Sequence, residues 1–337
     1  MRLGAPWSKA VFPNYSRVQR GTTVRGRILQ WGATHWFGGC IALLIAGHAV
    51  APSAATSSGA VIHTEDVERF YKVYEAAGGH PSAAQLQHDY LDPGSEGLHV
   101  FASARNVTGA TIADTLTKRP EIYADARRCL AVLPQVRRRV ELALHELGRL
   151  YPEASFPPVT IAVGRGKPVG MTKNSSGVQI GLEALCATDW LNPDVEDRFV
   201  LVIAHEYGHI EQLPAIADDD HPTVLAASLI EGGAEFTAEL IAGAVSNAQL
   251  GAEARGREKE TEEAFVADED KTDLSAWLYN SSPTQPRDLG YWVGYRIVKS
   301  YYQHTADKRQ ALRDIYGMTD PHQFLAKSGW YPGIQLD

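Results

Sequence analysis

The stretch His205-Glu206-Tyr207-Gly208-His209 decides the fold. It lies in a run whose apolar residues are spaced for one face of a helix: Val195, Phe199, Val202, Ile203 and Ile210. Residues four apart on a helix point the same way, so His205 and His209 can both reach one metal ion. Glu206, one step round the helix, can reach a water on that ion. The pattern therefore predicts a helix that carries a zinc site, with Glu206 as the catalytic base.

A second segment, Leu229-Ile230-Glu231-Gly232-Gly233-Ala234-Glu235-Phe236, supplies two carboxylates four residues apart. Two glycines inside a helix cost about 1 kcal/mol each relative to alanine, so close packing against another helix is expected. Zinc held by two histidines and one glutamate, with a fourth position open, is typical of catalytic sites. We therefore predict His205, His209 and Glu231 as the Zn²⁺ ligands, with Glu235 orienting His205. Glu235 is the competing third ligand, and the alternative without a metal is a solvated stripe of the glutamates at 231, 235 and 239.

These motifs resemble those of the gluzincin peptidases, which include thermolysin and aminopeptidase N. Closer resemblance is to the bacterial family of predicted zinc-dependent proteases related to gliding-motility lipoprotein B, over residues 159–325. Four stretches carry it: Ile161-Ala162-Val163-Gly164-Arg165-Gly166, Ile180-Gly181-Leu182-Glu183, the glutamate segment at 231–236, and Gly290-Tyr291-Trp292-Val293-Gly294-Tyr295. The resemblance implies a zincin-like metallopeptidase core. The chain departs from the thermolysin pattern between His209 and Glu231, where residues 217–221 form an acidic insertion.

Likeness to thermolysin implies a peptide or protein substrate whose bond is hydrolysed by a water that Glu206 deprotonates. An extended substrate is expected to pair with an edge strand at residues 178–181. Such sites add a tyrosine or histidine that donates to the oxyanion. Tyr291 and Tyr295 are four apart near the start of a helix, and we predict Tyr291 first, then Tyr295, in this role. The alternative is that these tyrosines pack into the core.

Two other functions fit the same motif. One is an envelope assembly or binding protein that keeps the zincin fold and the metal without turnover. Glu206 argues against it, because a structural zinc site has closed coordination and needs no base. The other is a zinc hydrolase that acts on a non-peptide amide bond.

The charge of the chain excludes nucleic acid as a partner. The first 60 residues contain six Lys or Arg and no Asp or Glu, which leaves 26 basic and 40 acidic residues, a net charge of −14, in the remainder. A body this acidic repels phosphate backbones.

The first 55 residues predict a signal peptide preceded by a basic leader. An apolar stretch at residues 40–47 follows the basic region, and small-residue cleavage sites follow at 49–51 and 53–55. The apolar stretch is shorter than the about 20 residues that a membrane span needs. We therefore predict export to the periplasm or the medium, and the alternative is an inner-membrane anchor at residues 36–51.

The remaining pattern predicts a mostly helical α+β fold with a small sheet beside the two motif-bearing helices. Helices are expected from Thr64 to a stop at Gly78, and at residues 121–150, 192–213, 221–248 and 288–304. Short β-branched runs at 159–163 and 178–182 predict a hairpin or sheet. Residues 251–273 predict a solvated helix or a lid-like excursion.

Two predicted parts, a helical one at 61–155 and the zincin-like catalytic one at 156–330, are expected to form one compact unit. Cys129 and Cys186 are the cysteines that follow the leader. They can pair in an oxidising compartment or remain two buried small side chains.

Overall fold

The computed structural model describes residues 61–336 apart from positions 174, 175, 218, 283 and 286. The predicted signal peptide at 1–55 and the alternative anchor at 36–51 lie outside the described residues. Within the described part, no helix combines the length and the apolar character that a membrane crossing requires.

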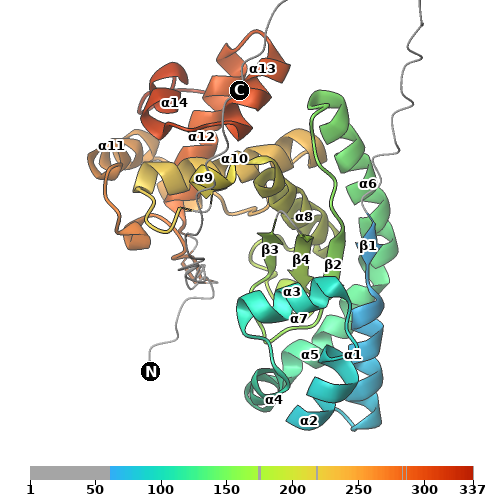
Figure 1. Ribbon diagram of the computed structural model, residues 1–337. Coiled ribbons are helices and arrows are strands. Elements are labelled where there is room, and N and C mark those ends of the chain that lie inside the picture. The colour runs from blue at the N-terminus through green and yellow to red at the C-terminus, as the bar shows by residue number, and fades with distance from the viewer. Residues whose placement is uncertain (1–60, 174–175, 218, 283, 286, 337) are drawn as a thin grey trace, which may run out of the picture. The chain divides into compact units, whose positions relative to one another are not determined.

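Four short strands form one mixed sheet in the order β1-β2-β4-β3 (Figure 1). Their bounds are Ile62–His63, Val159–Ala162, Gly177–Gly181 and Gly170–Lys173, in that spatial order. Strands β1 and β4 run parallel to β2, and β3 runs antiparallel to β4. The two predicted strands pair in parallel, so of the two alternatives, a hairpin or a sheet, the sheet is confirmed.

The predicted edge strand at 178–181 is wrong, because β4 lies between β2 and β3. The chain leaves β2, passes through β3 and then returns to fill the place beside β2. Strand β3 is short and contains Gly170, so its sequence resembles a turn more than a strand. The open edge nearest the histidine motif is therefore β3.

The predicted mostly helical α+β class is confirmed. The helices before β2 are α1 (Glu65–Ala76), α2 (Ala83–Gln85), a π-helical segment (Leu86–Leu91), α3 (Glu96–Arg105), α4 (Gly109–Lys118), α5 (Pro120–Ala126), a 3₁₀ segment (Arg127–Val132) and α6 (Leu133–Leu150). Those after β4 are α7 (Leu182–Cys186), α8 (Val195–Glu211), α9 (Pro214–Ala217), α10 (Val224–Ala242), α11 (Glu258–Asp268), α12 (Leu289–His304), α13 (Lys308–Tyr316) and α14 (Pro321–Lys327).

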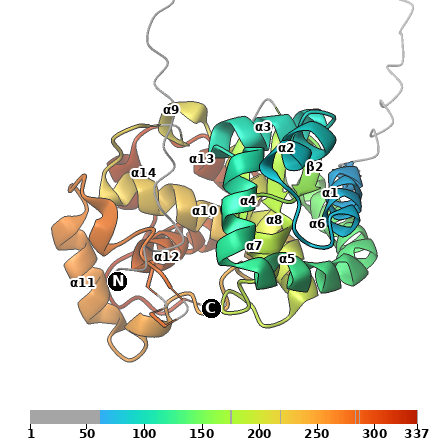
Figure 2. The same ribbon diagram turned by 90° about the horizontal axis from the view of Figure 1, so that it is seen from below.

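Two apolar clusters hold these elements together. The first surrounds the sheet and includes Phe70, Phe101 and Phe199, all fully buried. The second lies among α10 to α14 and includes Phe265 and Val293. Helix α10 packs against both α8 and α12, as the two views show (Figures 1 and 2). It therefore joins the sheet-bearing half to the C-terminal helices.

Glycines allow α10 to approach its neighbours as closely as predicted. A Cβ atom added at Gly232 would overlap the backbone nitrogen of Tyr295 in α12. On α8, a Cβ atom at Gly208 would lie 2.7 Å from the Cα of Ala234. The prediction of close helix packing is thus confirmed for Gly232, whereas a Cβ atom at Gly233 would lie 3.1 Å from the side chain of Gln212.

Of the solvated helix or lid-like excursion predicted at 251–273, the structure shows the helix α11, and buried residues fix it to its neighbours. Phe265 of α11 is fully buried and packs edge-on against Trp277, with ring centroids 5.2 Å apart. Glu262 is also fully buried and accepts a 2.6 Å hydrogen bond from Arg296 of α12. Helix α10 also ends earlier than predicted, because Gly243 adopts a left-handed conformation.

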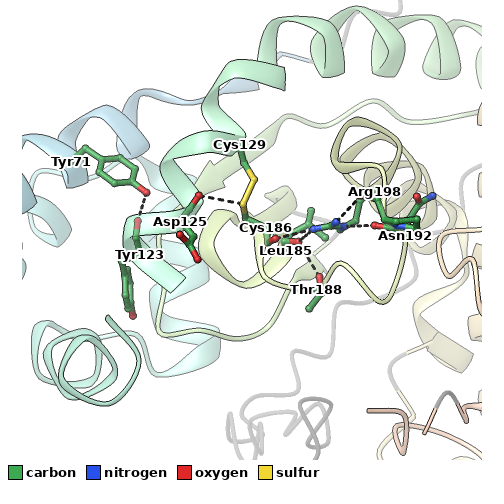
Figure 3. Close-up of a disulfide and its surroundings, with 10 residues drawn as sticks. Tyr71, Tyr123, Asp125, Cys129, Leu185, Cys186, Thr188, Asn192 and Arg198 are labelled. Atoms are coloured by element: carbon green, nitrogen blue, oxygen red, sulfur yellow. Dashed lines mark hydrogen bonds between the residues drawn. A yellow bond between two sulfur atoms is a disulfide. The ribbon is translucent and has the colours of Figure 1, made fainter. Parts of the chain in front are cut away.

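Cys129 and Cys186 form a disulfide between the 3₁₀ segment and the end of α7 (Figure 3). Arg198 of α8 donates to the carbonyls of Leu185 and Cys186, at 3.0 and 2.8 Å. The bridge closes a loop with a sequence separation of 57, which stabilises a fold by about 4 kcal/mol in the chain-entropy model. It therefore fixes α7 to the helical segment before α6, with Arg198 fixing α7 to α8.

Candidate metal centre

Helix α8 presents two histidines toward α10. The Nε2 atoms of His205 and His209 lie 3.2 Å apart. Glu231 of α10 places its Oε2 atom 3.5 Å from the first nitrogen and 3.3 Å from the second. In the described part of the chain these three residues form a group that can hold a metal, with ligand atoms within 4.8 Å of one another. The structure therefore brings together all three predicted ligands.

The electrostatics of this group fit a divalent cation. Burial lowers the pKa of His205, but Glu235 and Glu231 outweigh it and raise that pKa to about 10. Burial also opposes the shift at His209, whose pKa is raised chiefly by Glu231. Conversely, the two histidines hold the pKa of Glu231 well below its usual range in spite of burial. Without a metal, protonated histidines balance the negative charge of the carboxylates. The donor set of two imidazoles and one carboxylate is that of catalytic zinc sites.

Glu235 lies behind His205 rather than beside the converging atoms. Its Oε1 atom is 3.3 Å from Nδ1 of His205, the nitrogen opposite the converging one. Ser246 holds the same carboxylate with its backbone N–H at 2.7 Å and its hydroxyl at 2.6 Å. This geometry favours Glu231 as the third ligand, with Glu235 orienting the imidazole of His205.

Gln212 orients the imidazole of His209, a role that the sequence analysis did not predict. Nδ1 of His209 lies 2.8 Å from Oε1 of Gln212, whose Nε2 donates to the carbonyl of Ile230 at 2.7 Å. The bond ties the end of α8 to the residue before Glu231. A polar residue three positions after a histidine on one helix face was the available signal.

Tyr279 is a second residue that the sequence did not reveal. Its hydroxyl donates to Oε1 of Glu231 at 2.8 Å, which leaves Oε2 for the histidines. Tyr279 lies between α11 and α12 with φ at 57°, in the left-handed region that non-glycine residues seldom adopt. No periodic pattern marks such a position.

The structure separates the two predicted oxyanion donors. The ring of Tyr291 lies nearly parallel to that of His205, with centroids 6.4 Å apart, and its hydroxyl makes no hydrogen bond to a described residue. The hydroxyl of Tyr295 instead donates to Glu239 at 2.9 Å and accepts from Lys299 at 3.1 Å. Tyr291 is therefore beside the metal centre, whereas the Tyr295 hydroxyl is committed elsewhere.

Glu206 faces strand β3. Thr172 of β3 donates its hydroxyl to Oε2 of Glu206 at 2.7 Å. A Cβ atom added at Gly170 of the same strand would lie 2.6 Å from Oε1 of Glu206. The predicted base is thus held against the open edge of the sheet, next to His205 and His209.

Comparison with known proteins finds a family model that matches part of the chain. Residues 185–315 match the family described as predicted Zn-dependent protease (DUF2268). The matched segment contains α8, α10 and α12, and with them His205, His209, Glu231 and Tyr291. The resemblance to a zinc-protease family is therefore confirmed. Neither a curated protein nor a solved structure matches the chain.

Zinc binding to the metal-free protein is expected to release protons at pH 7, about one of them from His205. Both histidines have raised pKa values there, to about 10 for His205, and must become neutral to bind a metal. Protons therefore compete with zinc, so zinc affinity rises with pH up to about pH 10, and zinc occupancy and hydrolysis fall on the acid side. Titration calorimetry in buffers of different ionisation enthalpy measures the release. Zinc affinity that is the same at pH 5 and pH 8 would contradict the ligand assignment.

Proposed function

We propose that the protein is a zinc-dependent peptidase of the cell envelope that uses Glu206 as general base. One observation carries this proposal: the converging atoms of His205, His209 and Glu231 lie next to a glutamate that is held against an open strand edge. Zinc, when bound, supplies a Lewis acid that polarises a carbonyl and makes water acidic.

The residues of the chain supply the rest of the chemistry. Glu206 accepts the proton of the attacking water and passes it to the leaving amine. Thr172 fixes Oε2 of Glu206, which leaves Oε1 at the edge of β3, beside Gly170. Tyr291, with its hydroxyl uncommitted among the described residues, donates to the oxyanion.

An extended peptide is the substrate that this edge suits. Among the described residues no strand pairs with the outer side of β3, so its backbone groups can add another strand. The residues that face Glu206, Gly170 and Thr172, belong to that strand. A peptide bound along β3 therefore brings its backbone next to the base.

Metal analysis of the purified mature protein, together with cleavage of a mixed peptide library, tests the proposal. We expect about one zinc per chain and cleavage that a chelator abolishes and zinc restores. Stoichiometric zinc without cleavage of any peptide would contradict peptidase activity and favour a non-catalytic zincin-fold binding protein. Cleavage of non-peptide amides alone would indicate a zinc hydrolase that acts on non-peptide bonds.

Replacement of Tyr291 by phenylalanine is expected to lower turnover by about 10². The change removes a hydroxyl that makes no hydrogen bond to a described residue, so zinc content and melting temperature should stay nearly unchanged. Turnover on a cleaved peptide, normalised to zinc-loaded protein, is the measurement. Tyr295→Phe is the matched control, since its hydroxyl contacts Glu239 and Lys299. A loss of stability with normal turnover would show that Tyr291 only packs in the core.

The same proposal includes export. The basic leader with its apolar stretch and small-residue sites supports it. So does the Cys129–Cys186 disulfide, because such bonds persist in oxidising compartments. N-terminal sequencing of the protein from its native host is expected to begin after residue 51 or 55. An intact N-terminus on cytosolic protein with free thiols would contradict export.

A further inference from the structure

Two arginines lie side by side next to β3. Arg105 ends α3, and its Nε atom is 3.4 Å from Sδ of Met171 in β3. Arg165 lies between β2 and β3, and its Nε donates to the backbone carbonyl of Arg105 at 2.8 Å. Strand β3 therefore has Glu206 on one side and Arg105 on the other, with Arg165 hydrogen-bonded to Arg105.

The backbone around Arg165 is held by a buried carboxylate. Glu183 is fully buried and accepts hydrogen bonds from the N–H groups of Gly164 and Gly166, at 2.9 and 2.8 Å. Both oxygens of Glu183 are thus used by the residues that flank Arg165. These hydrogen bonds fix the backbone on both sides of Arg165, and so they restrict the positions that its guanidinium group can take.

Neither arginine forms an ion pair with a carboxylate of a described residue, although both are partly buried. Arg139 and Arg296, by contrast, pair with glutamates. Burial lowers the pKa of Arg105, the charge of Glu206 opposes this, and the charge of Arg165 adds to it. Two neighbouring cations partly withdrawn from water without an ion-paired anion are unfavourable, and a carboxylate is an anion whose geometry matches the guanidinium group.

Strand alternation relates the arginine pair to the substrate. Thr172 of β3 faces Glu206 on α8, so Met171 faces the opposite side of the sheet, where Arg105 lies. A peptide strand added to β3 alternates in the same way, and its side chains share faces with those of the residues opposite. The substrate residue opposite Met171 therefore directs its side chain toward Arg105 and Arg165.

We propose that Arg105 and Arg165 form a specificity site that selects peptides with a glutamate or aspartate at the position opposite Met171. The inference rests on the proposed function, because it needs a peptide bound along β3. A free C-terminal carboxylate offers the same chemistry from a second source. The arginine pair thus gives the peptidase a preference for acidic peptides in spite of its acidic body.

Paired peptides, identical except for glutamate or glutamine at one scanned position, test the proposal. Cleavage by the wild-type protein gives one readout, and binding to zinc-loaded Glu206→Gln protein by fluorescence anisotropy gives the other. We expect a preference of about 10- to 100-fold for glutamate at one position, as for a lost hydrogen bond to a charged group. Arg105→Gln and Arg165→Gln should each reduce that preference below about threefold. Arg105→Lys should retain part of it.

Arg149→Gln is the matched control, because Arg149 is exposed and pairs with Glu146 on α6. It should leave the preference intact. A preference for free over amidated C-termini that Arg105→Gln abolishes would support the site with the chain terminus as its ligand. Equal binding of all pairs, or a preference that persists in both well-folded arginine variants, would overturn it. Selective binding without cleavage would overturn the peptidase proposal but not this one.

Discussion

Glu206→Gln is expected to keep one zinc per chain and to lose at least about 10³ in turnover, within the range that general acid–base groups contribute. The substitution removes the base and leaves His205, His209 and Glu231 in place. Glutamine has nearly the same shape, and its carbonyl oxygen can still accept from Thr172, so the fold should not change. The measurements are kcat/KM on a cleaved peptide and zinc content of the same sample.

Glu211→Gln is the matched control for this experiment. Glu211 lies on the same helix, where its Oε1 accepts from the N–H of Ser155 at 2.9 Å, a bond that glutamine can also make. Its turnover should equal that of the wild type. If Glu206→Gln retains turnover within a few-fold of the wild type, Glu206 is not the base and the proposed mechanism is wrong.

The helix period was sufficient to predict that the two candidate ligand histidines lie together. Because His205 and His209 are four residues apart, any helix through them places both imidazoles on one side, whatever packs around it. The same period places Glu231 and Glu235 on one side of α10, but it cannot tell which carboxylate meets which nitrogen. That depends on where α10 crosses α8, at Gly208 and Ala234, and on the turn that brings Ser246 to Glu235.

Residues that depend on long-range contacts escaped prediction. Thr172 lies in a strand too short to show alternation, and its place at the edge follows from the parallel pairing of β2 with β4. Tyr279 contacts Glu231 from a loop, and its left-handed backbone conformation cannot be predicted from the local sequence. Arg105 and Arg165 are 60 residues apart and meet only through the sheet. Local periodicity carries no information about such pairs.

The disulfide shows the same limit. The sequence left Cys129 and Cys186 open between a bridge and two buried thiols, because a separation of 57 residues says nothing about distance. Their Cα atoms lie 6.2 Å apart, since α7 packs against α5, which leads into the turn that carries Cys129. That packing is a tertiary contact, which the sequence did not reveal. The sequence could indicate only an oxidising compartment, in which a disulfide is stable.

Glu231→Ala is expected to remove most of the zinc, whereas Glu235→Ala should weaken zinc binding by about 10- to 100-fold. Glu231 faces the Nε2 atoms of both histidines, so its loss removes a ligand and its negative charge. Glu235 faces Nδ1 of His205, so its loss only frees the imidazole to turn. Competition with a chromophoric chelator measures both zinc dissociation constants on one scale.

Thermal unfolding with and without a chelator provides an independent readout. Zinc at 1,000 times its dissociation constant stabilises the native state by about 4 kcal/mol, so the wild type should melt at a clearly lower temperature after zinc removal. Glu231→Ala should lose this difference, as should His209→Ala, while Glu235→Ala should keep part of it. If Glu235→Ala abolishes the difference and Glu231→Ala retains it, the two carboxylates have exchanged roles. The bond from Tyr279 would then hold a residue outside the metal's coordination sphere.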